Sequence, residues 1–157
     1  MAAQFENAFK GYREKIVRTV ESELQLIAAE VVADMQINLE HKPNIETGAL
    51  YNSCSYKMET AGNVVTAYIF ADAKSETGDL YAEFIEFGTG IYNQKGDGRT
   101  TPWRYQDREG NWHTTRGGRP YPFIRPAWAA HEDEFMKLAD SLQIEHAISR
   151  YRKKVTG

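Results

Sequence analysis

Residues 12–39, YREKIVRTVESELQLIAAEVVADMQINL, decide the architecture because their apolar residues follow the period of a helix. Apolar side chains recur three or four positions apart, as on one face of a long amphipathic helix. The stripe consists of Phe5, Phe9, Tyr12, Ile16, Val20, Leu24, Ile27, Val31 and Met35. The spacing predicts one helix over about residues 5–39, with Gly11 as its weakest position and Pro43 beyond its end.

The segment after this helix predicts a β-hairpin. Strands are expected over residues 53–58 and 64–71, with a turn at residues 60–63 between them. Both faces of the second strand are apolar, so we expect it to be a central strand that is covered on each side. Residues 80–87 then predict a short helical turn before the glycine-rich residues 88–90.

The next thirty residues, 91–120, form a connection too long and too polar for an ordinary loop. Within it, residues 103–106 and 111–114 flank a glycine-containing turn, a pattern typical of a β-hairpin. We interpret the segment as an extended hairpin arm with disordered flanks. This register places Trp112 on the same face as Trp103.

A second helix is predicted at the end of the chain. Pro126 suits a first helical turn, and apolar residues follow helical spacing until a phase slip near Ser141, where the helix is expected to kink or restart. The sequence therefore predicts one α+β domain over residues 1–157. It comprises a long N-terminal helix, a small antiparallel sheet with the hairpin arm at about residues 91–120, and a C-terminal helix.

Charge and cysteine content exclude several classes of protein. The single cysteine, Cys54, cannot form an internal disulfide and is interpreted as a packing residue. No apolar stretch suits a signal peptide or a membrane helix, so we expect the chain to be made and kept in the cytoplasm. The net charge is −3, but residues 91–121 carry +3 and the rest −6. This asymmetry suits docking of the arm onto an acidic surface, such as a copy of the same protein.

Side chains that could carry catalysis or bind a metal are scattered. No metal-binding spacing joins the histidines, His41, His113, His131 and His146. Glu83 and Glu86 lie three residues apart and could serve acid–base chemistry, but capping or pairing with an arginine is the simpler interpretation. We therefore expect no enzymatic activity and no cofactor.

The arm contains the residues with the clearest functional signal. Large aromatic side chains and arginines dominate protein interfaces, and a two-stranded ribbon alone is marginal in water. The candidate interface residues are Trp103, Arg104, Tyr105, Arg108, Trp112 and Arg116. Three interpretations stay open: docking on another subunit, folding back on the same domain, and stacking on nucleic-acid bases.

Three sequence blocks also match a known pattern. They are Thr47-Gly48-Ala49-Leu50 with Ser53, Tyr81-Ala82-Glu83-Phe84-Ile85-Glu86-Phe87-Gly88-Thr89-Gly90, and Pro122-Phe123-Ile124-Arg125-Pro126-Ala127. In this order they resemble the head–tail joining family of long-tailed bacteriophages, the gene-product-ten-like tail-completion or neck proteins. The likeness spans roughly residues 1–140 and includes the tryptophan-containing hairpin.

The resemblance implies structural roles for the motif residues Gly48, Leu50, Glu86, Phe87, Gly88, Thr89, Gly90, Pro122, Phe123 and Pro126. Gly88 and Gly90 are expected to adopt backbone angles that other residues avoid. Phe87 and Phe123 are expected to anchor both ends of the long loop in the core.

The function implied is that of a structural virion component at the head–tail interface. The resemblance implies a ring, expected to hold six subunits, which joins the head connector or stopper to the tail-tube or tail-terminator proteins. Genomic DNA would pass through without specific binding, and no enzyme, cofactor or membrane is implied. A related head-closure (stopper) or minor capsid role and a nucleic-acid-binding module stay open as alternatives.

Overall fold

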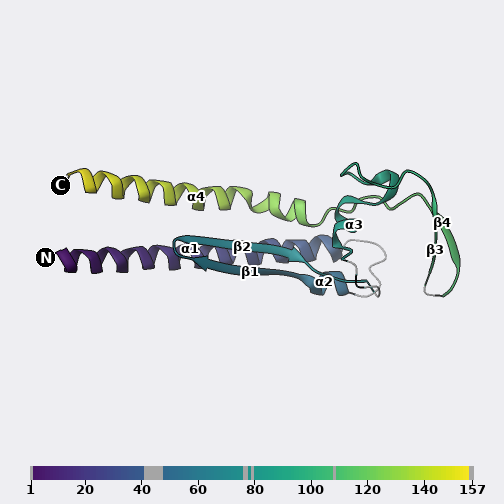
Figure 1. Cartoon of the computed structure of the whole chain (residues 1–157), viewed down its shortest axis with the longest axis horizontal. Coiled ribbons are helices and arrows are strands. Elements are labelled where there is room, and N and C mark those ends of the chain that lie inside the picture. The colour runs from purple at the N-terminus through teal and green to yellow at the C-terminus, as the bar shows by residue number, and fades with distance from the viewer. Residues whose placement is uncertain (1, 41–47, 76–77, 79, 108, 156–157) are drawn as a thin grey trace. The chain divides into compact units, whose positions relative to one another are not determined.

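The predicted α+β class is confirmed by a computed structural model (Figure 1), which describes residues 2–40, 48–75, 78, 80–107 and 109–155. Side chains are described between residues 10 and 141, with the same gaps. The elements are α1 (Ala2–Glu40), α2 (Ala49–Ser53), β1 (Cys54–Ala61), β2 (Val64–Ala71), α3 (Ala82–Phe87), the 3-10 helix η1 (Gly90–Tyr92), β3 (Trp103–Gln106), β4 (Trp112–Thr115) and α4 (Ile124–Val155).

The chain divides into two compact units. The first unit comprises Met1–Val32, Tyr56–Ile69 and Trp128–Gly157, and the second comprises Ala33–Ser55 and Phe70–Ala127. Helices α1 and α4 and strands β1 and β2 contribute residues to both units. Among the described residues, no helix combines the length and the apolar character needed to pass through a bilayer.

Helix α1 forms as its apolar period predicts, and it continues through Gly11 without a break. Its best-buried side chains are Ile27, Ala28, Val31, Met35 and Leu39. In the second unit, polar side chains of α1 hold neighbouring backbone: the amide of Gln36 donates to the Tyr51 carbonyl at 3.2 Å, and that of Asn38 to the Phe123 carbonyl at 3.1 Å. These bonds place the two buried residues Leu50 and Phe123 beside the end of α1.

Strands β1 and β2 form a hairpin that is closed by Gly62 and Asn63. In the first unit β1 lies against α1, because Gln25 donates to the Tyr56 hydroxyl at 3.3 Å and the Thr60 hydroxyl to Glu21 at 3.2 Å. The prediction that the second strand is central and covered on both sides is wrong. Among the described residues the sheet has two strands, and the outward-facing apolar side chains of β2, such as Val64, Tyr68 and Phe70, remain exposed.

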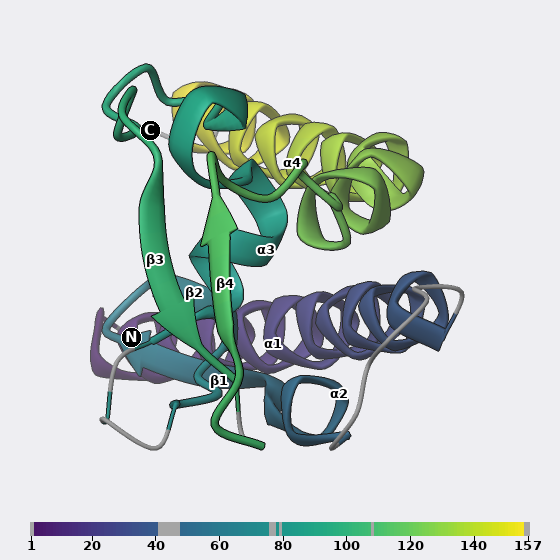
Figure 2. The ribbon, with the colours of Figure 1, turned by 90° about the vertical axis from the view of Figure 1, so that its right-hand side faces the viewer.

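Strands β3 and β4 form the predicted arm hairpin in the second unit (Figure 2). Its register differs from the prediction, because the loop spans five residues, 107–111, instead of four. Trp112 therefore pairs with Gln106, and Trp103 with Thr115. A shift of one residue moves every side chain of a strand to the other face, so the two tryptophans lie on opposite faces.

Helix α4 begins at Ile124 and contains Pro126 in its first turn, as predicted. A proline is tolerated there because the first N–H groups of a helix have no intrahelical partner. The helix is continuous through Ser141, so the predicted restart does not occur.

Leu39 and Leu80 provide a matched test of the core in the second unit. Leu39 is fully buried, whereas Leu80 is 55% exposed. We predict that Leu39→Ala lowers the free energy of unfolding by about 2–5 kcal/mol through lost burial and a cavity. Leu80→Ala should change it by less than about 0.5 kcal/mol. Urea denaturation of both variants checks this, and equal losses would contradict the placement of the core.

Candidate functional site

Glu86, the last acidic residue of α3, closes the N-terminus of α4. Its carboxylate is only 2% exposed and accepts hydrogen bonds from the backbone N–H groups of Phe123 at 2.7 Å, Ile124 at 2.9 Å and Arg125 at 3.2 Å. The first N–H groups of a helix otherwise lack partners, and the positive end of the helix dipole favours a negative charge. Glu86 therefore caps α4 from a different helix.

Arg125 supplies the counter-charge for this buried carboxylate. Its Nε donates to Glu86 Oε1 at 2.7 Å, and its Nη2 donates to the Glu86 carbonyl at 3.1 Å and to Gln94 Oε1 at 2.8 Å. The guanidinium also lies over the Phe87 ring, 4.8 Å from its centre. Burial raises the pKa of Glu86, but the hydrogen bonds from Ile124, Phe123 and Arg125 outweigh it and hold that pKa below its ordinary value.

The two glutamates of α3 serve different contacts. Both structural roles predicted for this pair, capping and pairing with an arginine, are found at Glu86. Glu83 is exposed and instead forms an ion pair with Lys95. Lys95 also lies over the Phe87 ring at 4.6 Å, so the half-buried ring is covered by cations from two segments.

Immediately after α3, two backbone segments touch at what we call the glycine crossing, residues 88–90 against residues 116–118. The N–H of Thr89 donates to the Gly118 carbonyl at 2.9 Å, and the N–H of Gly118 donates to the Thr89 hydroxyl at 2.8 Å. The N–H of Ile91 donates to the Arg116 carbonyl at 3.0 Å. Paired backbone thus joins the two ends of the segment that was expected to have disordered flanks.

Three glycines of this crossing, Gly88, Gly90 and Gly117, are required by both space and backbone angle. Gly88 and Gly90 have φ values of 77° and 61°, in the left-handed region that favours glycine. A Cβ at Gly90 would lie 1.9 Å from the Arg116 carbonyl oxygen, and one at Gly117 would lie 2.0 Å from the Thr89 carbonyl oxygen. Any side chain at either position would force the two segments apart.

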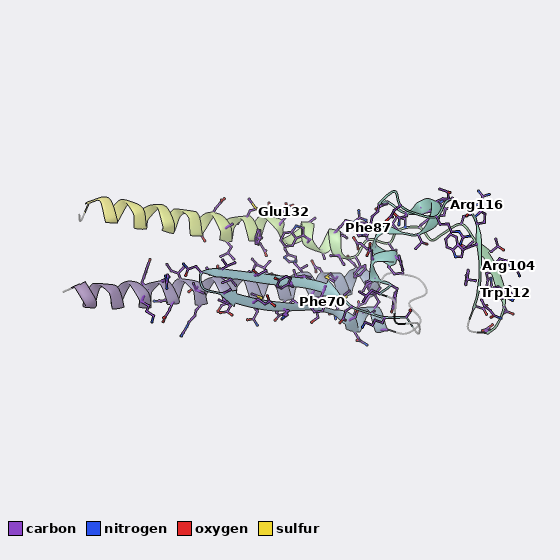
Figure 3. The ribbon with its side chains drawn as sticks, in the orientation of Figure 1. Phe70, Phe87, Arg104, Trp112, Arg116 and Glu132 are labelled. Atoms are coloured by element: carbon purple, nitrogen blue, oxygen red, sulfur yellow. The ribbon has the colours of Figure 1, made fainter. Side chains whose placement is uncertain are left out.

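The arm beyond the crossing carries arginines stacked on aromatic rings (Figure 3). The Arg104 guanidinium lies 4.9 Å from the Trp112 ring centre, and that of Arg99 lies 5.6 Å from the Trp103 ring centre. Trp112 remains 60% exposed. The predicted interface residues Tyr105 and Arg116 are also exposed and Trp103 is half-buried, whereas Arg108 lies outside the described residues.

A hydrogen-bond network around Asp107 fixes the tip of the arm. One carboxylate oxygen accepts from the N–H groups of Glu109 at 3.0 Å and Asn111 at 2.8 Å, and the other lies 2.7 Å from His113 Nε2. His113 and then Asn111 lower the pKa of Asp107 to about 2. His113 in turn stacks on Tyr105, with ring centres 5.3 Å apart. Neither Asp107 nor His113 carried a predicted role at this tip.

The first motif block has a local structural role in the second unit. Gly48 has a φ of 62°, and its carbonyl accepts the Asn52 N–H at 2.9 Å, which starts α2. Leu50 is buried, and its carbonyl accepts bonds from the Ser53 hydroxyl at 2.8 Å and the Cys54 thiol at 3.4 Å. Burial raises the pKa of Cys54 to about 11, in accord with a packing role.

One polar cluster in the first unit was missed from the sequence. His131 Nδ1 of α4 lies 3.2 Å from a carboxylate oxygen of Glu134 and 3.7 Å from one of Glu30 on α1. Among the described residues, this is the group whose geometry could hold a metal ion, with donor atoms within 4.8 Å of one another. Glu30 and His131 are a hundred residues apart in sequence, so no local spacing could have revealed the cluster.

Comparisons with protein-family models, with curated proteins and with solved structures find no match for this chain. The likeness to head–tail joining proteins therefore depends on the three sequence blocks. The second and third blocks meet at Glu86 and the start of α4, and they flank the arm on both sides.

A comparison of Gly90 with Gly96 separates the effect of the backbone angle from that of the close contact at the glycine crossing. Both have positive φ, but a Cβ at Gly96 would meet nothing within 4 Å. We predict that Gly90→Ala costs about 3 kcal/mol or more, because backbone strain and a collision with Arg116 add. Gly96→Ala should cost only about 1 kcal/mol, from strain alone. Thermal unfolding of the two variants measures the difference, and similar costs would argue against the close backbone approach.

The Glu86 cap predicts how a substitution at this position changes the stability of the protein and how that change depends on pH. We expect Glu86→Gln to lower stability by about 3 kcal/mol, because buried donors and Arg125 lose their charged partner. Glu83→Gln should cost less than about 1 kcal/mol, as for an exposed ion pair.

Because folding lowers the pKa of Glu86, its contribution is complete above the ordinary value of 4.5 and is lost as pH falls through the folded-state pKa. The stability gap between wild type and Glu86→Gln, measured by urea denaturation, should therefore shrink below pH 4.5. A gap that does not change with pH would mean that Glu86 is not the ionised cap.

Proposed function

We propose that this chain is a structural virion protein of a tailed bacteriophage, a ring-forming head–tail joining subunit that connects the head connector to the tail. The observation that carries the proposal is the arm: a ribbon with exposed tryptophan and arginine side chains, held at its base by motif residues. Such a surface is suited to binding another protein, because aromatic residues and arginines supply most of the energy at interfaces.

The roles of the motif residues support a mechanical function. Glu86 ties α3 to α4, and Gly88 and Gly90 lock both ends of the arm together. Both carboxylate oxygens of Glu86 accept hydrogen bonds from donors of the protein itself. Residues of the EFGTG and PFIRPA blocks therefore take part directly in anchoring the arm.

Exposed apolar surface elsewhere also favours assembly. Leu26, Val64, Tyr68 and Met136 are each about half exposed or more. Val64 and Tyr68 lie on the same face of β2, and neighbouring exposed apolar side chains of this kind commonly mark a protein interface. In the proposed ring, the partners are neighbouring copies, the connector or stopper on the head side and the tube or terminator on the tail side. The negative charge outside the arm suits a lumen that DNA traverses without binding.

Nucleic-acid binding is a second candidate, because the arm is basic and carries exposed rings. It is less favoured, since Arg104 already occupies one face of the Trp112 ring on which a base would stack. A salt-dependent affinity for DNA that disappears on Arg104→Ala would favour it. Electron microscopy of particles would distinguish a tail-completion position from a stopper or minor capsid position.

The decisive variant replaces Trp103–Thr115 by a short Gly-Ser linker. Because Trp103 and Thr115 are paired, a few residues close the gap and leave the glycine crossing intact. We predict a folded protein whose phage produces separate heads and tails, as seen by electron microscopy. The matched control, Trp128→Ala outside the arm, should support joined particles. Normal particles from the arm-less variant would overturn the proposed function.

A further inference from the structure

The arginines of the arm have hydrogen-bond donors available for a partner. Among the described residues, no carboxylate lies within ion-pair distance of Arg104, Arg116 or Arg119. Arg104 stacks on Trp112 and Arg119 on Tyr92, which restrains each guanidinium and covers one flat face. The N–H donors in the guanidinium plane stay free, and their geometry matches a carboxylate.

The first unit presents an acidic surface of complementary composition. Within this unit, helix α1 carries Glu21, Glu23 and Glu30 and no lysine or arginine between Thr19 and Val32. Glu23, Leu26 and Glu30 follow the three- and four-residue spacing of one helix face, and all three are exposed. Glu134 joins them from α4 through His131. We call Glu23, Leu26, Glu30 and Glu134 the acidic helix face.

The geometry of this face favours a guanidinium over a metal ion. Glu30 and Glu134 are 58% and 52% exposed, whereas protein zinc sites are enclosed by three or four fixed ligands. The His131 ring contacts both carboxylates through Nδ1, and the exposure of each carboxylate leaves lone pairs accessible to a partner. Leu26, 65% exposed, provides an apolar area next to them.

We infer that the acidic helix face receives the arm of a second copy of this chain. Arg104 and Arg116 would pair with Glu23, Glu30 and Glu134, and the exposed Trp112 ring would cover Leu26. The inference rests on the proposed function, because it treats the arm as an assembly element. It goes further by naming the surface that the arm contacts. Because arm and face are different patches, the contact is heterologous and propagates from copy to copy, as a ring requires.

A charge-reversal experiment on the full chain tests this pairing. The arm variant carries Arg104→Glu and Arg116→Glu, and the face variant carries Glu23→Lys and Glu30→Lys. The controls apply equal charge changes elsewhere, Arg13→Glu with Arg18→Glu on α1 and Glu132→Lys with Asp133→Lys on α4. All of these side chains are exposed, so each variant should fold, which circular dichroism checks.

Sedimentation velocity at millimolar concentration and low ionic strength gives the readout. Wild type and both controls should self-associate, whereas each variant should associate at least about a hundredfold more weakly. Mixing the arm variant with the face variant should give a one-to-one dimer that grows no further, since one intact face meets one intact arm. A chain with both reversals should recover self-association.

Several results would overturn the inference. They are a monomeric wild type under these conditions, a face variant that assembles like wild type, and a mixture of the two variants that stays monomeric. An arm that folds onto its own face would give a monomeric wild type. If particles join normally with the face variant but not without the arm, the proposed function stands and this docking surface is wrong.

Discussion

A buried, ionised carboxylate is the constraint on which the arm's position depends. Glu86 is removed from water, which disfavours a charge strongly unless donors replace the lost hydration. The backbone N–H groups of Phe123, Ile124 and Arg125 and the Arg125 guanidinium supply those donors. All of them lie at the start of α4, nearly forty residues later in the chain. The Glu86 carboxylate is therefore stabilised by these donors. It also caps α4 and fixes the position where the chain returns from the arm. The glycine crossing begins two residues after it, which explains why these motif residues are contiguous.

The physical consequence is a ribbon with a rigid base and an exposed surface. A two-stranded ribbon has little stability of its own. Here its two ends are paired through Thr89, Ile91 and Gly118, and its tip is closed by the Asp107 network. Stacking of Arg104 on Trp112 restrains two side chains that would otherwise lose rotamer freedom on binding. Preorganisation of this kind lowers the entropic cost of association, which would favour the proposed binding of another protein.

The sequence predicted the elements whose signals are local. The period of α1, the hairpin between β1 and β2, the short helix α3 and the role of Pro126 follow from spacing within a few residues, and the structure confirms them. The contacts of Glu86 were also predictable in kind, because capping and pairing with an arginine were the simpler interpretation of the carboxylate pair. Backbone constraints at Gly88 and Gly90 were expected, although their cause, close contact with residues 116–118, was not.

The predictions that failed depended on contacts between segments far apart in sequence or on the exact length of a loop. The apolar character of β2 indicated two covered faces, but no local pattern says whether a covering layer belongs to the same chain. One extra residue in the loop at Asp107 reversed the face of Trp112. The contact of Glu30 with His131 joins segments a hundred residues apart, beyond the range of any periodicity.

We propose that the arm becomes buried against another copy of the protein. Cryo-electron microscopy of assembled particles tests this proposal most directly, because it locates Trp112 in its final surroundings. We expect the Trp112 ring, 60% exposed in the single chain, to be enclosed by the adjacent protomer. A Trp112 ring that faces solvent in the assembled particle, or that packs wholly within its own chain, would contradict this account.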